Sequence, residues 1–441
     1  MSIARSINTL SLAPTLAFAG FLAVSGPAGA VDVQKVTSPG GIQAWLVEEH
    51  TVPVVALNFA FSGGASQDPD GKSGLANFMS SLLDEGAEDL DSTAFQKALE
   101  ETQARIGFSV GRDFFYGDMR TLSFLADESF ELLRKAVTAP RFDSEPIDRM
   151  RRQVISGLKR DETDPDALAS QALFATLFPD HPYGNRRSGT IEHIEAITRD
   201  DLVAHHRAIF AKEHLKVAVV GAISAEKLAP LLDQVFGDLP ETANLKAIPE
   251  IVPQTDQAIA TPLEVPQSAI RMALPSIKRS DPDFLAAFVM NHILGGGSFT
   301  SRLYSEVREK RGFVYSVYSR LVPYNRSALF FVGAGSRSET ADDTVDLIIQ
   351  EIKRMGEEGP TPEEFEKAKK FLTGSYALRF DTSNKIAGQL LGLQLNDLPA
   401  DYINTRNDQI NALELDDIKR IANKILAEAV PTVVVVGQPG S

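Results

Sequence analysis

The sequence predicts an α+β protein built from two homologous domains, each a mostly antiparallel sheet covered by helices. Three observations support this fold class. Alternating apolar strands open the chain after residue 30, a helix-and-strand segment occurs twice, and a proline-rich stretch separates the two copies. The chain has 441 residues, which is enough for two packed domains with a large core.

The first domain is predicted at residues 31–245 and opens with two strands, IQAWLVEE and PVVALNFAFSGG. The second of these alternates apolar and polar residues, as expected for a strand with one buried face. A helix is predicted from Ser73, whose side chain can cap it. Further helices are predicted over residues 93–102, 129–138 and 146–160, and the domain closes with the strand KVAVVGAIS.

A linker is predicted at residues 246–262 and the second domain at residues 263–441. The linker carries Pro249, Pro253 and Pro262 and shows no helical periodicity. Proline favours extended backbone and cannot donate the hydrogen bonds of a regular helix, so the boundary is placed here.

The second half of the chain repeats the first. The helix and strand that end at Gly437 match, without a gap, the segment that ends at Gly221, 216 residues earlier. LANFMSSLLDEG also resembles LAAFVMNHILGG, at a similar offset of 210 residues. Chance likeness between two helix–strand units is the alternative for one match, but two matches in the same order favour duplication.

The N-terminus predicts a signal peptide over residues 1–30. Arg5 supplies a positive charge, an apolar run covers residues 10–24, and small residues at 28–30 precede the expected cleavage point. A mitochondrial transit peptide ranks second because it would carry more arginine. The mature chain is therefore expected in a bacterial periplasm, and no later stretch predicts a membrane span.

Composition excludes several classes of function. The net charge is −15 with no local cluster of Lys and Arg, so no nucleic-acid partner is expected. The chain has no cysteine, which excludes disulfides and thiolate chemistry. None of the 7 histidines lies in an H-x-x-E-H or H-E-x-x-H pattern, and no G-x-S-x-G motif is found.

Two segments resemble the pitrilysin/insulinase family of zinc peptidases: SGLANFMSSLLDEG (residues 73–86) and GGGSFTSRLYSEVREKRGFVYSVYS (residues 295–319). Active members carry H-x-x-E-H on the first helix, where two His bind zinc and the Glu activates water. The matching positions here hold Asn77, Ser80 and Ser81, and Gly157 falls where the family has its third ligand, a Glu. The resemblance therefore implies that this chain binds no zinc.

The second segment keeps more of the family pattern. In active members an Arg and a Tyr seven residues apart bind substrate beside the zinc, and the matching residues here are Arg308 and Tyr315. Arg offers a planar fork of donors, and a Tyr hydroxyl can donate to an oxyanion. The alternative is structural: Arg308 forms a salt bridge with Glu306 or Glu309, and Tyr315 packs.

Two further segments have open interpretations. Gly295, Gly296 and Gly297 either end the preceding helix or form a loop that handles substrate, as in non-catalytic mitochondrial processing subunits. The strand from Arg105 to Gly117 corresponds to one that can pair with substrate backbone in the family, or it is an ordinary internal strand.

The resemblance implies that this chain is half of a clam-shaped dimer. It predicts a non-catalytic, pseudo-peptidase subunit of a heterodimeric zinc peptidase. Such a subunit pairs with an H-x-x-E-H homologue that holds the zinc, helps enclose peptide substrates, and contributes Arg308 and Tyr315. Two alternatives remain: a homodimeric peptide-binding or scaffolding protein, and an active zinc peptidase in its own right.

Overall fold

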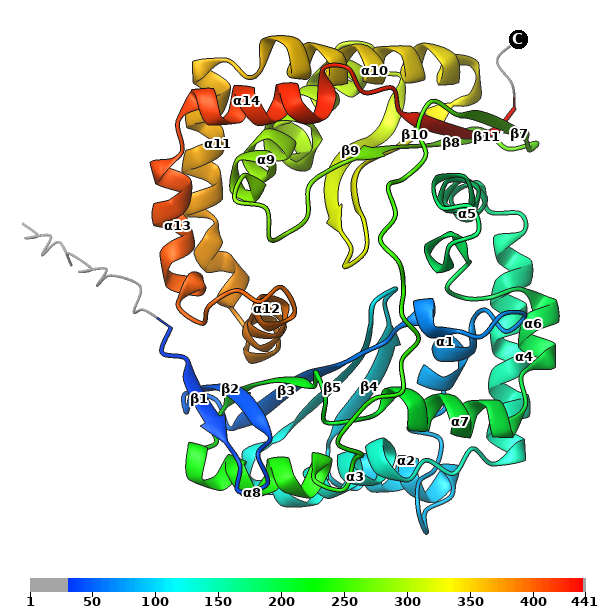
Figure 1. Ribbon diagram of the computed structural model, residues 1–441, viewed down its shortest axis with the longest axis vertical. Helices are drawn as coiled ribbons and strands as arrows, with labels where there is room; N and C mark the ends of the chain where they lie inside the picture. Colours follow the sequence, from blue (N-terminus) through cyan, green and yellow to red (C-terminus); the bar gives the residue numbers. More distant parts are fainter. Residues whose placement is uncertain (1–30, 439–441) are drawn as a thin grey trace, which may run out of the picture. The chain divides into compact units, whose positions relative to one another are not determined.

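The computed structural model describes residues 31–438, so the predicted signal peptide lies outside the described part of the chain. Its first sheet has six strands in the order β1-β2-β6-β3-β5-β4, and only the β2–β6 pair is parallel (Figure 1). The strands are β1 (Gln34–Thr37), β2 (Gln43–Glu48), β3 (Val54–Ser62), β4 (Arg105–Val110), β5 (Phe114–Leu122) and β6 (Lys216–Gly221).

The second sheet repeats this topology. Its order is β7-β11-β8-β10-β9, with β7–β11 the parallel pair. The strands are β7 (Ala258–Pro262), β8 (Gln267–Pro275), β9 (Val314–Pro323), β10 (Ala328–Arg337) and β11 (Thr432–Gly437). Each strand from β2 to β6 thus has a counterpart, and the α+β fold class is confirmed. The predicted linker ends in a strand, because its last five residues are β7.

Fourteen α-helices surround the sheets within residues 31–438. The first half contributes α1 (Leu75–Ser80), α2 (Ser92–Glu101), α3 (Ala126–Thr138), α4 (Ser144–Asp161), α5 (Pro165–Leu177), α6 (Ile191–Ala196), α7 (Arg199–Ile209) and α8 (Ala225–Phe236). The second contributes α9 (Phe284–Asn291), α10 (Ala341–Glu358), α11 (Pro362–Gly374), α12 (Ser383–Leu395), α13 (Tyr402–Ala412) and α14 (Leu415–Leu426). No helix in this part of the chain is long and apolar enough to cross a membrane.

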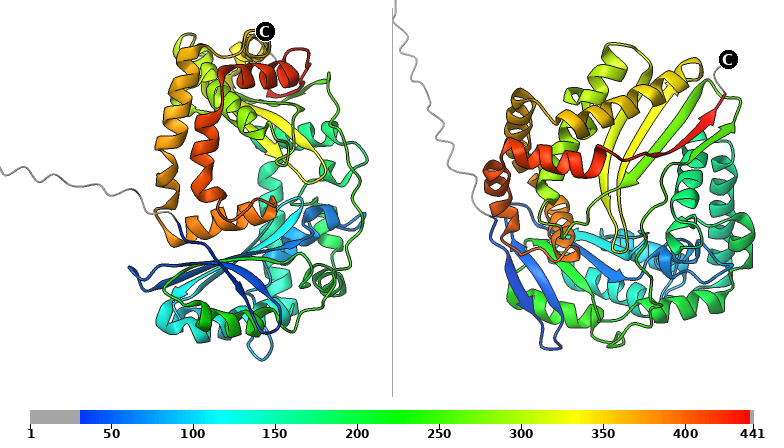
Figure 2. Two further views of the ribbon diagram at one scale, coloured as in Figure 1. Left: turned by 60° about the vertical axis from the view of Figure 1, so that its left-hand side comes forward. Right: turned by 45° about the horizontal axis from the view of Figure 1, so that its top comes forward.

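Each half provides one helix to the sheet of the other half. Helix α5 packs on β8 and β11, where Leu173 and Leu177 join Phe331 in one apolar cluster. Helix α12 packs on β3 and β6, where Leu390 and Ala387 are fully buried (Figures 1 and 2). The opposite faces of the sheets hold the two main cores, with α3 and α8 on the first and α9, α10 and α14 on the second. Strand β6 reads KVAVVG because both of its faces are covered. In β11 (TVVVVG) the face toward α5 is buried, whereas Val435 on the other face is only partly buried.

Candidate functional site

Helix α1 is short: it contains Asn77 and Ser80, and Ser81 is the cap residue that follows it. It begins after Gly74, which has φ +91°, and no side chain of its cap residue bonds the helix. The carboxylate of Asp68 instead accepts the backbone N–H groups of Gly74 (2.7 Å) and Ala76 (2.8 Å). The prediction that Ser73 caps this helix is wrong, because its hydroxyl bonds His193 Nδ1 at 2.7 Å.

The degenerate positions do not form a set of metal ligands. The Ser80 hydroxyl donates to the carbonyl of Asn77, and the Ser81 hydroxyl donates to the carbonyl of Phe78, both at 2.7 Å. Gly157 on α4 has no side chain, and a Cβ added there would meet only the Arg160 guanidinium at 3.7 Å. Serine hydroxyls turned onto their own backbone are poor zinc donors. These residues therefore do not fit zinc.

Asn77 lies at a cavity of about 1090 Å³ between the two halves of the described chain. The β4–β5 hairpin and helix α12 line it, together with α5 and the C-terminal end of β9. Polar side chains at the cavity include Asn58, Asn77, Arg112, Asp113, Tyr116, Asp118, Gln171, Arg187, Arg320 and Asn325. The lining also includes apolar side chains such as Phe174, Phe331 and Leu391, so the cavity has a mixed polar and apolar surface.

Burial changes the ionisation of several cavity groups. Arg112 is only 9% exposed, and burial lowers its pKa. Its guanidinium lies 4.1 Å from the centre of the Phe174 ring and donates to the Asn185 carbonyl. Burial raises the pKa of Asp113, and it raises that of Tyr116 to about 12. The cavity thus holds a buried cation that interacts through an aromatic face and a carbonyl, a signal that the sequence did not provide.

Arg308 and Tyr315 lie on one segment but outside this cavity. Arg308 belongs to a π-helical turn, Tyr304–Glu309, and Tyr315 to β9. The Arg308 guanidinium donates to the Tyr304 hydroxyl at 2.6 Å and lies over the Tyr304 ring. The Tyr315 side chain is on the surface, with an exposed fraction of 60%. A salt bridge of Arg308 to Glu306 or Glu309 is not found among the described residues.

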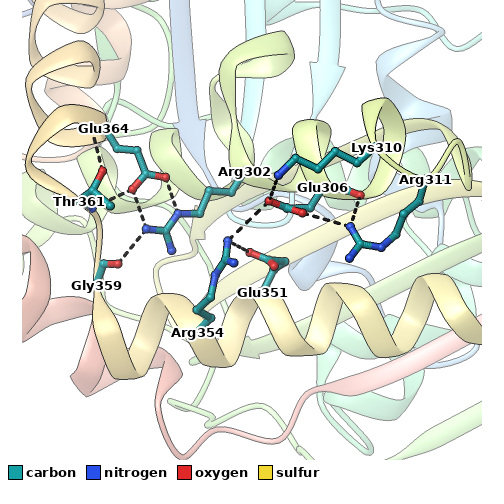
Figure 3. Close-up of polar contacts among 9 residues, drawn as sticks. All are labelled: Arg302, Glu306, Lys310, Arg311, Glu351, Arg354, Gly359, Thr361 and Glu364. Carbon is teal, nitrogen blue, oxygen red and sulfur yellow. Dashed lines mark hydrogen bonds and ion pairs between the residues drawn. The ribbon is translucent and has the colours of Figure 1, made fainter.

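Glu306 is instead part of a charge network that holds the Arg308 turn against α10 (Figure 3). Glu306 pairs with Lys310 at 2.8 Å and with Arg311 at 3.1 Å on its own segment. It also approaches Arg354 of α10 at 3.9 Å, and Arg354 in turn pairs with buried Glu351 at 2.6 Å. These ion pairs connect the turn that carries Arg308 to α10.

A separate group of polar contacts holds the residues before the turn (Figure 3). Arg302 Nη2 donates to a carboxylate oxygen of Glu364 at 2.7 Å and to the carbonyl of Gly359 at 2.9 Å. Glu364 is the third residue of α11 and also accepts the backbone N–H of Thr361 in a capping box. The segment that carries Arg308 is therefore fixed to both α10 and α11.

Close packing explains why glycine occupies positions 295, 296 and 297 of the same segment. Gly295 and Gly296 are part of a π-helical segment, His292–Gly296. A Cβ would lie 2.5 Å from Ser319 Oγ at Gly295, 2.6 Å from Asn291 Nδ2 at Gly296 and 2.7 Å from the His292 carbonyl at Gly297. Close approach of this segment to β9 and to its own preceding turn therefore requires glycine. The segment from Arg105 to Gly117 comprises β4, which is an edge strand of the first sheet, and the start of β5, which is internal. The interpretation as an internal strand is therefore wrong for β4.

Three buried residues near α1 carry no sequence signal of their own: Asp68, His205 and His206. Burial raises the pKa of Asp68 to about 7 and lowers the pKa of each histidine to about 4. His205 Nε2 lies 3.7 Å from the Asp68 carboxylate, and His206 Nε2 lies 2.9 Å from the Val137 carbonyl. They are part of the packing behind α1. Within residues 31–438 no group of three His, Asp or Glu is placed to hold a metal ion.

The fold and this site define a zinc-peptidase-like protein that lacks the ligands of the zinc helix. The chain belongs to the insulinase family, peptidase family M16. The family described as "Insulinase (Peptidase family M16)" matches residues 44–191, and the family described as "Peptidase M16 inactive domain" matches residues 196–372. The resemblance seen in the two segments is confirmed.

Related proteins agree with this assignment. The chain is 28% identical over 383 residues to a "Non-peptidase homolog YmxG" of Helicobacter pylori, covering 84% of this chain and 86% of the relative. It is 24% identical over 423 residues to an uncharacterized zinc protease of Streptomyces coelicolor, covering 94% and 91%. A crystal structure of a peptidase M16 inactive domain from Pseudomonas fluorescens has a TM-score of 0.86 and 29% identity, covering 92% of this chain and 98% of that one. The chain is an inactive-domain homologue of the family.

Proposed function

We propose that this chain is the non-catalytic subunit of a heterodimeric zinc peptidase. It pairs with a homologue that carries H-x-x-E-H and the zinc, helps enclose peptide substrates, and contributes Arg308 and Tyr315 to the partner's active site. The predicted signal peptide favours the periplasm as the location of this complex. The chain alone does not hydrolyse peptides.

The contrast between the two segments carries the proposal. At the positions of the family's zinc site, the hydroxyls of Ser80 and Ser81 bond backbone carbonyls of α1. On β9, Tyr315 is 60% exposed, and Arg308 has no carboxylate partner among the described residues. The Arg308 guanidinium and the Tyr315 hydroxyl thus lie on a surface segment that other contacts hold in place. This position suits hydrogen-bond donors that act on a substrate bound by the partner.

Co-purification tests the pairing. The chain, tagged at its C-terminus, is isolated under mild conditions from the periplasm of its source. Recovery of a homologous chain with H-x-x-E-H at equal stoichiometry, and with zinc, is the expected result. Recovery of this chain alone as a zinc-free homodimer would contradict the proposal.

Substitution then tests the donors. In the reconstituted pair, Tyr315→Phe or Arg308→Ala should lower turnover of a peptide substrate roughly ten- to a thousandfold, the scale of losing one transition-state donor. Tyr318→Phe, on the same strand and 37% exposed, is the matched control and should leave turnover unchanged. Wild-type turnover in both the Tyr315 and Arg308 variants would exclude a role at the active site.

The cavity between the two halves favours a second candidate, a homodimeric peptide-binding or scaffolding protein. A cavity of about 1090 Å³ within one chain could hold an extended peptide without help from a catalytic partner. Binding of labelled peptides to the purified chain in the absence of any homologue, together with the homodimer outcome above, would favour this candidate.

A further inference from the structure

One face of the second sheet is uncovered where the equivalent face of the first sheet is closed. The strand registers establish the equivalence: Ala218 of β6 lies beside Trp45, and Val434 of β11, 216 residues later, lies beside Ile259. Ala258 and Ala260 are therefore the counterparts of Ala44 and Leu46, and Val435 is the counterpart of Val219.

Helices α3 and α10 are equivalent in the same way. Each begins directly after a three-residue 3₁₀ turn, Ser123–Leu125 or Ser338–Thr340. The Thr121–Ser129 hydroxyl pair recurs as Ser336–Thr344. Phe130 of α3 therefore corresponds to Val345 of α10.

The two sets of counterparts differ in exposure. In the first domain Ala44, Leu46, Phe130 and Val219 are at most 1% exposed. In the second domain Ala258 and Ala260 are exposed, and Val345 and Val435 are partly exposed. These residues are apolar, so the second domain leaves in contact with solvent a face that the first domain buries.

Helix α8 accounts for the difference in exposure between the two domains. It packs against α3 and β1, and it buries Leu228, Leu232 and Phe236 in the first core. Two polar contacts join α8 to α3. Lys227 Nζ lies 3.5 Å from Asp127 Oδ1, and Gln234 Nε2 donates to Glu131 Oε2 at 2.8 Å. The second domain has no counterpart of α8 within residues 31–438, since β11 is the last element there.

A groove of about 670 Å³ occupies the corresponding place. Its floor is apolar, from α10, β7 and β11: Ala258, Ile259, Ala260, Val345, Ile349, Ile352, Val433 and Val435. Its rim is acidic, with Asp256, Asp342 and Glu428 against one cation, Lys353. Asp342 is the counterpart of Asp127, and it forms no ion pair with any other described residue.

We propose that this groove binds an amphipathic helix of a partner protein, in the position that α8 has in the first domain. The helix carries an apolar stripe toward Val345, Ile349 and Val435, and a Lys or Arg near its N-terminus opposite Asp342. The α8 of a second copy of this chain is not the occupant, because it is buried in the first domain of that copy. The site is separate from the Arg308 turn and does not depend on the peptidase pairing.

A peptide with the sequence of α8 tests the groove directly. The probe is a fluorescein-labelled peptide that covers residues 222–239, AISAEKLAPLLDQVFGDL, and carries Pro230→Ala to favour the helix. Fluorescence anisotropy with the full chain should show saturable binding with a dissociation constant on the order of 10 μM, typical of a short helix in a groove. No saturable binding would overturn the proposal.

Variants locate the binding. Ile349→Asp places a charge on the groove floor and should raise the dissociation constant at least about tenfold. Leu378→Asp, at a residue that is 73% exposed and outside the groove, is the matched control and should bind as the wild type does. A peptide with Lys227→Glu should bind several-fold more weakly because it faces Asp342. Equal affinity of the Ile349→Asp and Leu378→Asp proteins would show that the peptide binds elsewhere and would overturn the proposal.

Discussion

Asp68 is the residue that fixes the N-terminus of α1. Its carboxylate accepts two backbone N–H groups of the helix, and it lies 3.7 Å from His205. Burial raises the pKa of Asp68 to about 7, and burial lowers the pKa of His205 and of His206 to about 4. Each of the three groups therefore favours its neutral form more strongly in the folded protein than in the unfolded chain.

These shifts make stability depend on pH. The neutral histidines stabilise the fold above their unfolded pKa of about 6.5, and this stability is lost as the pH falls toward 4. Asp68 has the opposite effect. Its contribution to stability is complete below about pH 3.9 and is lost as the pH rises through about 7. Between pH 4 and 6.5, the free energy of unfolding rises with pH because of the two histidines and falls with pH because of Asp68. From these groups the free energy of unfolding should rise by about 1.4 kcal/mol per pH unit.

Urea unfolding of His206→Gln between pH 5 and 6.5 measures this effect. Glutamine can still donate to the Val137 carbonyl but does not titrate. The slope of unfolding free energy against pH should fall by about 1.4 kcal/mol per unit relative to the wild type. His214→Gln, on an exposed side chain, is the control and should leave the slope as it is. Equal slopes for the wild type and His206→Gln would mean that His206 is not kept neutral by the fold.

At the residue scale, the sequence identified the residues that belong to a known motif, but it did not identify residues whose properties arise from burial. Asn77, Ser80 and Ser81 were identified because a known pattern has ligands at those positions. Asp68 and Arg112 match no catalytic or metal-binding motif in the sequence. Their properties arise from tertiary packing, which places them below the surface beside groups far away in sequence.

At the scale of elements, α5 and α12 connect the two halves. Leu173 of α5 is fully buried against the second sheet, although α5 belongs to the first half of the sequence. Leu173→Ala should lower the free energy of unfolding by roughly 2–5 kcal/mol, the cost of a large-to-small change in a core. Amide hydrogen exchange should then rise first in β8 and β11, the strands that α5 covers.

Leu158→Ala is the matched control, because Leu158 on α4 is 3% exposed and packs in the core of the first sheet. Its effect on exchange should appear first in the first domain. If Leu173→Ala raised exchange in β3 and β5 before β8 and β11, the packing of α5 described above would not govern local stability.

The sequence predicted β2, β3, β6 and β11 and the repeat, but it did not predict β8, β10 or this exchange of helices. Alternation is a local pattern, and the 216-residue match compares two segments. These patterns were therefore enough to identify β6 and β11 and to relate them to each other. The apolar residues of α5 show that it is buried, but a pattern does not say against which sheet. The strand β7 was likewise read as linker, because Pro262 and its neighbours carry no clear alternation.

At the scale of the whole molecule, the exchange of helices makes the halves interdependent. Without α12, the first sheet would expose Ala56, Ala60 and Val220, and without α5, the second would expose Leu329, Phe331 and Val434. Burying a large apolar side chain contributes roughly 1.5–3 kcal/mol. Several of them therefore equal a substantial part of the 5–15 kcal/mol or so that stabilises a typical domain.

Separate expression of residues 31–245 and 246–441 tests this interdependence. Each half alone should aggregate or bind a hydrophobic dye, because it exposes a continuous apolar face and carries a helix without its sheet. The two halves expressed together should co-purify as a one-to-one complex that does not bind the dye and has the circular dichroism of the intact chain. A single half that is monomeric, unfolds cooperatively and does not bind the dye would contradict the prediction. The sheets would then be stable without the exchanged helices, and α5 and α12 would serve to set the shape of the cavity between them.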